Sequence, residues 1–403
     1  MRDVLGSLRD WYATGRPFGL ATVVAVTRSA PRQPGAAMAV GPDGEVVGSV
    51  SGGCVEGAVY DLATEVVATD EPVLRTYGYS DSDAVAVGLT CGGTVGIFVQ
   101  AVDAARLPQL GAVLASIEAR RPVALATVLA GGRAGARLAV WPDGLGAGTG
   151  TRRGDVQGTL GNDGLDAAVT DDARGMLAHG STGQRHYGPR GERRRDDVTV
   201  FIESYATPPR LLVFGAIDFA AAMARIGTFL GYHVTVCDAR AVFATRRRFP
   251  DADEVVVEWP HRYLARTAVD ERTAICVLTH DPKFDVPLLR VALRTPAGYV
   301  GAMGSRRTHD ERLKGLREAG LTEPELARLR SPIGLDLGAR TPEETAVAIA
   351  AEIVAGRWGG SGRPLAQTDG AIHGSDRDPA RDPFGNPAGD PFGDPAGSPV
   401  GTG

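Results

Sequence analysis

The first half of the chain repeats one pattern of apolar and polar positions. The matched segments are RPFGLATVV from Arg16 and RPVALATVL from Arg121, MAVGPDG from Met38 and LAVWPDG from Leu138, GSVSGGCVEGAVYD from Gly48 and GTLGNDGLDAAVTD from Gly158, and VGIFVQ from Val95 and VTVFIE from Val198. In each copy, two apolar β-rich runs precede a glycine-rich turn, a segment with apolar residues at helical spacing, and a closing apolar run. We therefore predict a duplicated α/β domain over residues 1–207, with repeats at about residues 16–101 and 121–204.

A different pattern begins at Arg210. LLVFGAIDFAAAMARIGTFLGYHVTVCDAR predicts a strand, a glycine turn, a helix and a second strand that ends in Asp238, which is the opening unit of a doubly wound parallel sheet. Further apolar runs follow in EVVVE, TAICVLTHD and GYVGAMG, and TPEE from Thr341 predicts the capped start of a last helix. These features predict a Rossmann-like α/β domain over residues 208–357.

Residues 358–403 differ in composition from both predicted domains. Gly, Pro, Asp and Ser dominate, and the octad DPFGNPAG is followed directly by DPFGDPAG. Such a segment cannot bury enough apolar surface to offset the entropy lost on ordering. We therefore expect a disordered C-terminal tail.

The overall composition is that of an ordinary soluble protein, with 43% hydrophobic and 23% charged residues. A net charge of -5 lacks the basic footprint of a nucleic-acid-binding protein. The sequence has no apolar run of membrane-spanning length, and its N-terminus lacks the layout of a signal peptide. The four cysteines lack paired spacing, which favours thiols in a reducing compartment over disulfides or a zinc site. We expect a cytoplasmic protein without a membrane span.

The turn SGGCVE in the first repeat is the main candidate for chemistry. Gly52 and Gly53 would let a ligand approach the backbone closely, and the start of the following helix offers N–H groups with a positive partial charge. That charge favours the thiolate of Cys54, a group that binds soft metals or carries sulfur. Glu56 is expected to cap the exposed amides or to act as an acid or base, and a solvated helix residue is an equal alternative. The alternative for Cys54 is a small buried residue that packs between strand and helix.

The second repeat provides an internal comparison for this turn. It has Asp163-Gly164 at the positions of Gly53-Cys54, so the repeated fold does not itself require a thiol there. We therefore interpret Cys54 as a functional residue.

A second cysteine lies in a similar turn, where Cys91, Gly92 and Gly93 precede the closing strand of the first repeat. Two such turns in one repeat are able to converge on one pocket with Cys54. A β-turn with an incidental buried thiol explains the pattern equally well.

The glycine turn of the second domain matches only the first glycine of the dinucleotide-binding fingerprint, Gly215. Ile217 stands where the second glycine would let a pyrophosphate approach, and Asp218 adds a negative charge at the helix start. Asp238 remains in the place of the ribose-binding acid. The turn therefore predicts weak or no binding of NAD(P).

A better anion site is predicted where GYVGAMG ends. Gly304, Ser305, Arg306 and Arg307 combine a strand end, a helix start and two guanidinium groups, which suits a phosphate. The alternative is an arginine pair on a solvated helix.

Five segments together closely resemble the XdhC/CoxI family of maturation factors for xanthine dehydrogenase and related molybdenum hydroxylases. They are PRQPGAAMAV, GSVSGGCVE, LTCGG, YVGAMGSRR and SPIGLDLGARTPEETAVAIAAEI, and they occur in the family's order within about residues 10–356. The resemblance does not extend to the tail.

The resemblance implies a cytoplasmic chaperone that binds the molybdenum cofactor (molybdopterin with its metal) as transient cargo. Such a chaperone supports sulfuration of the cofactor and delivers it to the apo form of a xanthine or carbon monoxide dehydrogenase. The family's cysteines carry over to Cys54 and Cys91, and its SRR element to Ser305, Arg306 and Arg307. From the softness of a thiolate, we expect Cys54 to hold or screen the metal. A cysteine desulfurase is a further candidate partner, and a homodimer is left open.

Two alternatives compete with this hypothesis. One is a Rossmann oxidoreductase that uses NAD(P), and the other is a scaffold that bridges a cysteine desulfurase and the hydroxylase without binding the cofactor. Binding of NADH or NADPH would favour the first, and protein that contains no pterin would favour the second.

Overall fold

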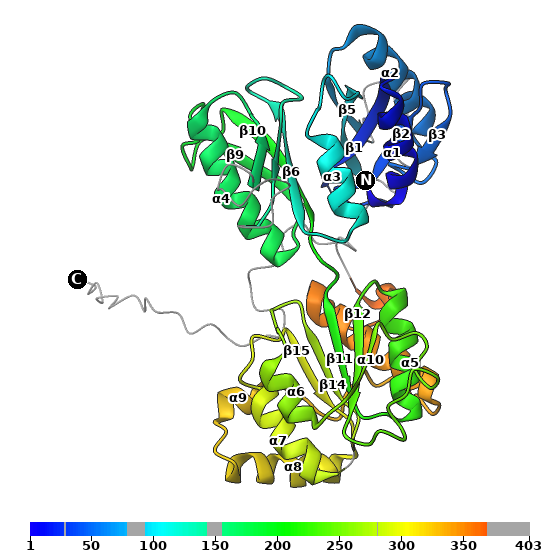
Figure 1. Ribbon diagram of the computed structural model, residues 1–403, viewed down its shortest axis with the longest axis vertical. Helices are drawn as coiled ribbons and strands as arrows, with labels where there is room; N and C mark the ends of the chain where they lie inside the picture. The colour runs from blue at the N-terminus through cyan, green and yellow to red at the C-terminus, as the bar shows by residue number, and fades with distance from the viewer. Residues whose placement is uncertain (28–29, 79–92, 143–154, 280, 369–403) are drawn as a thin grey trace, which may run out of the picture. The chain divides into compact units, whose positions relative to one another are not determined.

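The structure is a computed structural model that describes residues 1–27, 30–78, 93–142, 155–279 and 281–368. These residues form two compact units, one built on Met1–Pro208 and the other on Pro209–Pro364 (Figure 1). Within the described residues, no helix combines the length and apolar character that a membrane crossing needs.

The first unit contains the same series of elements twice. The first repeat consists of α1 (Leu5–Thr14), β1 (Phe18–Thr27), β2 (Ala37–Val40), β3 (Val46–Gly48), α2 (Glu56–Thr69), β4 (Val73–Gly78) and β5 (Thr94–Val102). The second repeat consists of α3 (Leu110–Glu118), β6 (Val123–Ala130), β7 (Arg137–Val140), β8 (Val156–Gly158), α4 (Asp163–His179), β9 (Gly183–Tyr187) and β10 (Val198–Tyr205). The duplication predicted from the sequence is confirmed.

Each repeat forms one five-stranded antiparallel sheet, and the two strand orders correspond: β3-β2-β1-β5-β4 and β8-β7-β6-β10-β9. The sequence predicts only three strands per copy. It misses β3 and β4 in the first repeat and their equivalents, β8 and β9, in the second. All four are edge strands that are very short or carry mostly polar, exposed residues. Such strands lack the alternation of buried and exposed positions that makes a strand recognisable.

The two sheets share a core on the faces turned away from α2 and α4. Val24, Phe98, Leu129 and Phe201 form one cluster there, and Val24 matches Leu129, and Phe98 matches Phe201, in the repeat alignment. Side chains from α1 and α3 extend this core around the fully buried Trp141. Neither repeat therefore buries its second sheet face alone, and the two fold as one unit.

A glycine is required where the third strand of each repeat ends. Gly48 and Gly158 have φ angles of +79° and +93°, a region that favours glycine. A Cβ at either position would lie 2.2 Å from a backbone oxygen, that of Ala37 or Arg137 respectively. This close approach to the neighbouring strand sets the direction of the turn that leads into α2 or α4.

The second unit is a doubly wound parallel sheet of strand order β13-β12-β11-β14-β15-β16. Its strands are β11 (Arg210–Phe214), β12 (His233–Asp238), β13 (Glu254–Val257), β14 (Ala274–Val277), β15 (Tyr299–Ala302) and β16 (Leu329–Arg330). Its helices are α5 (Asp218–Phe229), α6 (Pro260–Arg266), α7 (Pro282–Ala292), α8 (Arg306–Glu318), α9 (Glu323–Ala327) and α10 (Pro342–Trp358). The predicted Rossmann-like fold is confirmed.

Alternate residues of the central strand β11 enter the two cores of this unit. Leu211 and Val213 pack with α5 and α10, whereas Leu212 and Phe214 pack with α6, α7 and α8. The helices therefore cover both faces of the sheet (Figure 1). Since the strand order reverses between β11 and β14, the carboxyl ends of these strands mark the switch point at which such sheets bind ligands.

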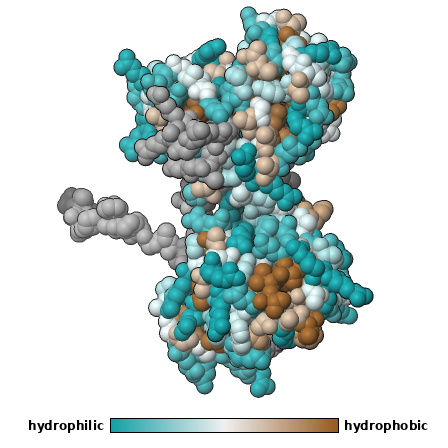
Figure 2. Space-filling view, in the orientation of Figure 1, coloured by the Kyte–Doolittle hydropathy of each residue, from teal (hydrophilic) through white to brown (hydrophobic). Residues whose placement is uncertain are grey.

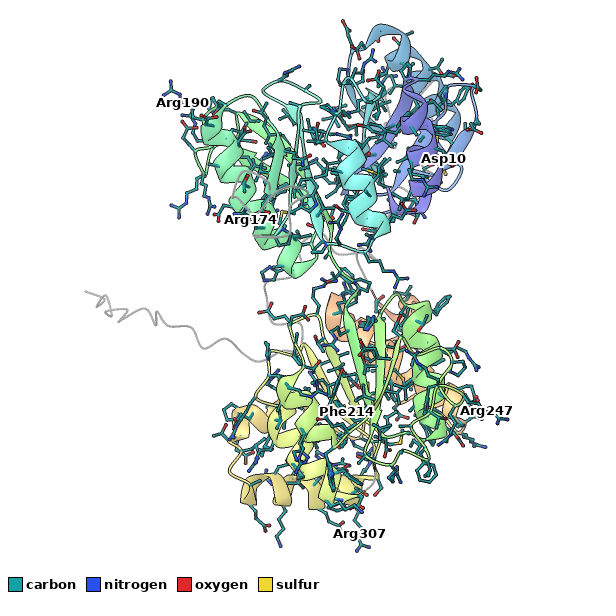
Figure 3. The ribbon with its side chains drawn as sticks, in the orientation of Figure 1. Asp10, Arg174, Arg190, Phe214, Arg247 and Arg307 are labelled. Carbon is teal, nitrogen blue, oxygen red and sulfur yellow. The ribbon has the colours of Figure 1, made fainter. Side chains whose placement is uncertain are left out.

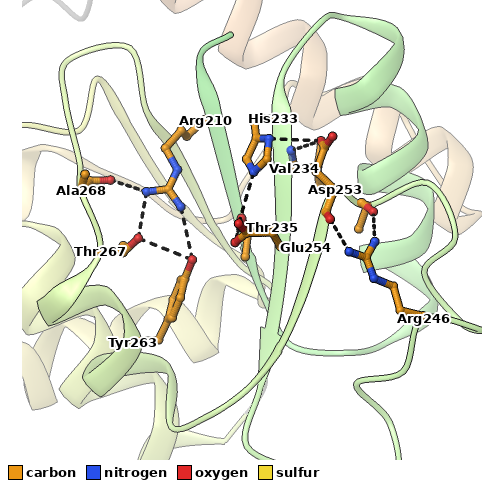
Figure 4. A network of polar contacts seen from close by, with 11 residues as sticks. Arg210, His233, Val234, Thr235, Arg246, Asp253, Glu254, Tyr263, Thr267 and Ala268 are labelled. Atoms are coloured by element: carbon orange, nitrogen blue, oxygen red, sulfur yellow. Dashed lines mark hydrogen bonds and ion pairs between the residues drawn. The ribbon is translucent and has the colours of Figure 1, made fainter. Parts of the chain in front are cut away.

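Polar contacts fix the opposite, amino-terminal edge of this sheet (Figure 4). Arg210 at the start of β11 donates hydrogen bonds to Thr267 Oγ1 at 2.8 Å, to the Ala268 carbonyl at 2.6 Å and to Tyr263 Oη at 3.2 Å. The Asp253 carboxylate accepts the Val234 amide at 2.8 Å. These bonds hold the starts of β11 and β12 in place at this edge of the sheet.

The last helix and the segment after it differ partly from expectation. Thr341 caps α10 through a reciprocal capping box with Glu344, as the sequence predicts. The helix continues to Trp358, and a short 3-10 helix covers Leu365–Gln367 within the predicted tail. Residues 369–403 lie outside the described residues.

Candidate functional site

The turn that carries Cys54 joins β3 to α2. Gly52 and Gly53 have φ angles of +76° and +117°, a backbone region that favours glycine, and they turn the chain towards α2. Cys54 follows them directly and is separated from the first residue of α2 by Val55 alone. The Cys54 side chain is half-buried against the core between the sheet and α2. Among the described cysteines it is the one that is not buried, since Cys237 and Cys276 lie within the parallel sheet.

The Glu56 carboxylate holds this turn in place. Its oxygens accept hydrogen bonds from the Ser49 hydroxyl at 2.7 Å, the Ser51 amide at 2.9 Å and the Gly53 amide at 2.8 Å. The Ser51 hydroxyl donates to it as well, and the amides of Val50 and Val55 lie at 3.3 and 3.2 Å. Burial opposes ionisation, but these donors, led by Ser51 and Ser49, lower the pKa of Glu56 from 4.5 to about 2.

Of the roles expected for Glu56, its contacts therefore support the one in which it caps the amides of the turn before α2. The same contacts correct a second expectation, because the amides of this turn are not open to an anionic ligand. The amide of Cys54 also has a partner inside the turn, the Ser51 hydroxyl at 3.0 Å. Gly52 and Gly53 thus shape the loop, and the chemically distinctive group of the turn is the Cys54 thiol.

The corresponding turn of the second repeat is covered by protein. Asn162 caps α4 through the Leu165 amide and donates a hydrogen bond to the Pro189 carbonyl in the β9–β10 loop. A Cβ at Gly164, the counterpart of Cys54, would lie 2.4 Å from the Arg190 carbonyl oxygen. The glycine therefore has a packing reason of its own, which the comparison of the two sequences could not reveal.

The second cysteine turn is only partly described. Cys91 and Gly92 lie outside the described residues, and Gly93 directly precedes β5. His280, at the end of the predicted strand TAICVLTHD, also lies outside them.

The glycine turn after β11 packs closely against the end of β14. Gly215 has a φ of +111°, and a Cβ on it would lie 2.9 Å from Thr279 Cγ2. Close packing against the residues that follow β14 therefore explains why position 215 is a glycine. At the start of α5, Asp218 forms an ion pair with Arg248 at 3.2 Å.

Asp238 is buried, and each of its oxygens already accepts two hydrogen bonds. Oδ1 accepts the amide and Nε of Arg240 at 2.9 Å, and Oδ2 accepts the Ala216 amide and Arg240 Nη2 at 2.8 Å. Burial opposes ionisation, yet the hydrogen bonds from Arg240 and Ala216 lower the pKa of Asp238. A ribose hydroxyl would have to displace one of these donors, because a carboxylate has about four acceptor sites.

The predicted anion element after β15 is formed only in part. Ser305 caps α8 by accepting the Thr308 amide at 3.1 Å, with Gly304 before it. Arg307 is 88% exposed, pairs with Glu311 at 3.0 Å and points away from the body of its unit (Figure 3). Arg306 is exposed at the first position of α8, and no polar partner contacts it among the described residues.

A buried ion pair behind this element was missed in the sequence. Arg312 of α8 contacts the Asp285 carboxylate of α7 at 3.0 Å, and Asp285 also accepts the Thr279 hydroxyl at the end of β14. The same guanidinium donates to the Met303 carbonyl at 2.7 Å and to the Ser331 hydroxyl at 2.9 Å. Arg312 stands in a helix full of charges, so no sequence signal separates it from its exposed neighbours.

The segment SPIGLDLGAR after β16 also belongs to this edge of the sheet. The Ile333 amide donates to the Ala302 carbonyl of β15 at 3.1 Å, and the Gly334 amide donates to Glu352 Oε2 of α10 at 2.8 Å. Two motifs about 25 residues apart, YVGAMGSRR and SPIGLDLGAR, therefore meet in one place. Among the described residues, no group of three or more His, Cys, Asp or Glu side chains is placed to hold a metal ion.

Known proteins share both units of the chain. A Bacillus subtilis (strain 168) protein that is named as a probable xanthine dehydrogenase subunit is 25% identical over 342 residues, which are 83% of this chain and 92% of that protein. The molybdenum cofactor insertion chaperone PaoD of Escherichia coli (strain K12) is 27% identical over 356 residues, 88% of each. A crystal structure of a xanthine dehydrogenase from Bacillus halodurans has the same fold, with a TM-score of 0.63 at 23% identity over 87% of this chain and 94% of its own.

Family models match in the same order as the two units. The XdhC and CoxI family model matches residues 11–78 and 116–188, one segment in each repeat of the first unit. The XdhC Rossmann domain model matches residues 211–353, which span the parallel sheet of the second unit. The chain therefore belongs to the XdhC and CoxI family, with an XdhC Rossmann domain as its second unit.

Proposed function

We propose that this chain is a cytoplasmic carrier that binds the molybdenum cofactor as transient cargo and passes it to the apo form of a molybdenum hydroxylase. The observation that carries the proposal is the half-buried Cys54 thiol on a turn locked by Glu56. The similarity to a protein named as a molybdenum cofactor insertion chaperone supports it, and so does the similarity to a protein named for xanthine dehydrogenase.

Cys54 is the proposed ligand of the cargo's metal. A thiolate is a soft donor and is suited to a thiophilic metal, and the locked turn keeps Sγ in one place so that little ordering entropy is lost on binding. While the metal is held there, the cargo remains available to a sulfur donor such as a cysteine desulfurase. The hydroxylase then takes the cargo from this single thiolate.

Cys91 is included in the proposed site because, like Cys54, it neighbours two glycines in the first repeat. In the second repeat, the loop that joins β9 to β10 lies on the turn before α4, where the Pro189 carbonyl accepts a hydrogen bond from Asn162. The segment that carries Cys91 joins the corresponding strands, β4 and β5, of the first repeat. Cys91 lies outside the described residues, and its place in the proposed site rests on the CGG pattern of the sequence alone.

In the second unit, Arg306 and the first turn of α8 after Gly304 and Ser305 are the proposed anion-binding element. Arg307 contributes less, because Glu311 already pairs with it. The oxidoreductase alternative receives no support from the switch point, where Asp238 is saturated and Thr279 packs against Gly215. Weak binding of NAD(P) stays a prediction.

The proposal is tested on protein purified without oxygen from a host that makes the molybdenum cofactor. Bound molybdenum and the fluorescence of oxidised pterin are measured in the wild type, in Cys54→Ser and in Cys276→Ser, a buried thiol far from solvent that serves as the matched control. We expect both signals in the wild type, a loss of about tenfold or more in Cys54→Ser, and no change in Cys276→Ser.

Equal signals in the wild type and in Cys54→Ser would remove Cys54 from the site. Wild-type protein that contains neither molybdenum nor pterin, even after incubation with released cofactor, would favour the scaffold that bridges a cysteine desulfurase and the hydroxylase.

A further inference from the structure

A pocket of about 320 Å³ lies at the carboxyl end of β15 in the second unit. We call it the β15 pocket; Phe219 in the first turn of α5, Met303, Gly304, Ile333 and Arg340 are among the residues that line it. Its volume is at the lower end of the range typical of small-molecule sites. None of the chemistry assigned above uses Phe219, Ile333 or Arg340.

The wall that Ile333 forms is fixed in position. A Cβ on Gly301 of β15 would lie 2.5 Å from Ile333 Cδ1, so only glycine there lets Ile333 sit on the strand. Glu352 of α10 accepts hydrogen bonds from the Gly334 amide at 2.8 Å and from the Tyr299 hydroxyl at 2.5 Å. The pocket is therefore preformed rather than dependent on a mobile segment.

A buried cation lies directly behind the Gly304 wall. Arg312 is 4% exposed, and its Nη1 lies 3.5 Å from the position that a Cβ on Gly304 would occupy. Its Nε is buried and has no hydrogen-bond partner within the described part of the chain. Asp285 balances the charge from the side of α7, and the Ser331 hydroxyl accepts a hydrogen bond from Nη1 at 2.9 Å, so the guanidinium adds positive charge close to Gly304 without lining the pocket itself.

The lining combines flat apolar surface with positive charge. Phe219, Met303 and Ile333 form apolar walls, whereas Arg340 is exposed and its side chain contacts no acceptor among the described residues. Gly304 leads into the first turn of α8, whose N–H groups and Arg306 favour an anion. A ligand that fits must have both a planar ring for the apolar walls and a compact negative group.

We infer that the β15 pocket binds a planar heteroaromatic monophosphate, with the ring beside Phe219 and Ile333 and the phosphate towards Arg340 and the start of α8. Two ligands share this chemistry: a pterin that carries a phosphate, as in the proposed cargo, and a nucleoside monophosphate. The choice of a pterin over a nucleoside monophosphate rests on the proposed function. The existence of the binding site rests on the pocket alone.

The β15 pocket lies beside the switch point, where the acidic residue of a dinucleotide site is already occupied by the protein's own donors. Thr279 fills the space beside Gly215, and Asp238 has no free acceptor site. Phe219 belongs to the first turn of the helix that follows this turn, so the pocket is lined by the start of the same helix. Binding is thereby shifted from the β11–β14 crevice to β15.

The inference is tested by titrating the full chain with neopterin monophosphate, guanosine and uridine monophosphates, and inorganic phosphate. We compare the wild type with Arg340→Ala and Phe219→Leu, which remove the cation and the flat ring. The matched controls are Arg247→Ala and Phe229→Leu; Arg247 is an exposed arginine (Figure 3), and Phe229 is 85% exposed at the far end of α5. Arg340→Ala should fold normally, because its side chain makes no polar contact among the described residues.

We expect neopterin monophosphate to bind the wild type, about tenfold or more weakly to Arg340→Ala and Phe219→Leu, and without change to both controls. Tighter binding of a nucleoside monophosphate under the same dependence would assign the site to a nucleotide. Failure of all ring-containing probes to bind, equal binding to all variants, or binding of inorganic phosphate alone with the same affinity would overturn the inference.

The outcome is separable from that of the proposed function. Loss of probe binding in Arg340→Ala, combined with full retention of molybdenum in Cys54→Ser, would keep the pocket and reject Cys54 as the metal ligand. The reverse result would keep Cys54 and reject the pocket.

Discussion

At the scale of single residues, two carboxylates that the sequence places in candidate ligand-binding turns accept hydrogen bonds from the protein's own groups instead. Glu56 receives the donors of its own turn, and Asp238 receives Arg240 and the Ala216 amide. Both acids shape a loop that a ligand would approach, and neither has an oxygen to spare. The groups that remain for chemistry are a thiol, Cys54, and cations such as Arg306 and Arg340.

Replacing Glu56 by Gln should destabilise the first unit. The amide would present N–H groups to donors that now face an anion, and we expect the free energy of unfolding to fall by about 1–3 kcal/mol at neutral pH. Because the pKa of Glu56 is lowered from 4.5 to about 2, its contribution is fully present above pH 4.5 and is lost as the pH falls through about 2. Urea unfolding of both proteins across this range measures the effect.

The matched control is Glu65→Gln, an exposed position on the same helix. It should change stability little at any pH. A Glu56→Gln effect that stays constant down to pH 2 would show that the ionised carboxylate is not its source.

At the scale of elements, the sequence predicts the strands and helices that have a regular apolar pattern, and it misses the edge strands and the pocket, which depend on tertiary packing. The duplicated halves and the parallel sheet are readable because apolar periodicity marks their central strands and helices. The edge strands β3, β4, β8 and β9 are not, since few of their residues are buried. The β15 pocket is likewise hidden, because it exists only once the segment around Ile333 folds back onto β15.

Helix α4 offers a test of why Gly164 replaces Cys54. Gly164→Ala would place a Cβ 2.4 Å from the Arg190 carbonyl oxygen, and we expect the unfolding free energy to fall by about 1–3 kcal/mol. Gly175→Ala, on the same helix, meets no atom within 4 Å and should raise it by about 0.5–1 kcal/mol. Thermal unfolding of the two variants measures both signs, and equal effects would contradict the packing account.

At the scale of the whole chain, each unit has cores of its own and presents its own candidate site. The first unit holds Cys54 on a turn between an antiparallel sheet and a helix, and the second holds the β15 pocket at the carboxyl edge of a parallel sheet. Apolar side chains also gather on the surface of the second unit (Figure 2). Separately, Val242, Val257 and Trp259 are among the exposed apolar residues of this unit.

Separate cores predict separate unfolding. Leu62 packs between α2 and the first sheet, and Leu289 packs between α7 and the parallel sheet; truncating either to Ala should cost about 2–5 kcal/mol. We expect hydrogen exchange followed by mass spectrometry to show faster exchange only in Met1–Pro208 for Leu62→Ala and only in Pro209–Pro364 for Leu289→Ala. Faster exchange in both units from one substitution would instead mean that the two unfold together, and variants of one candidate site would then have to be tested for effects on the other.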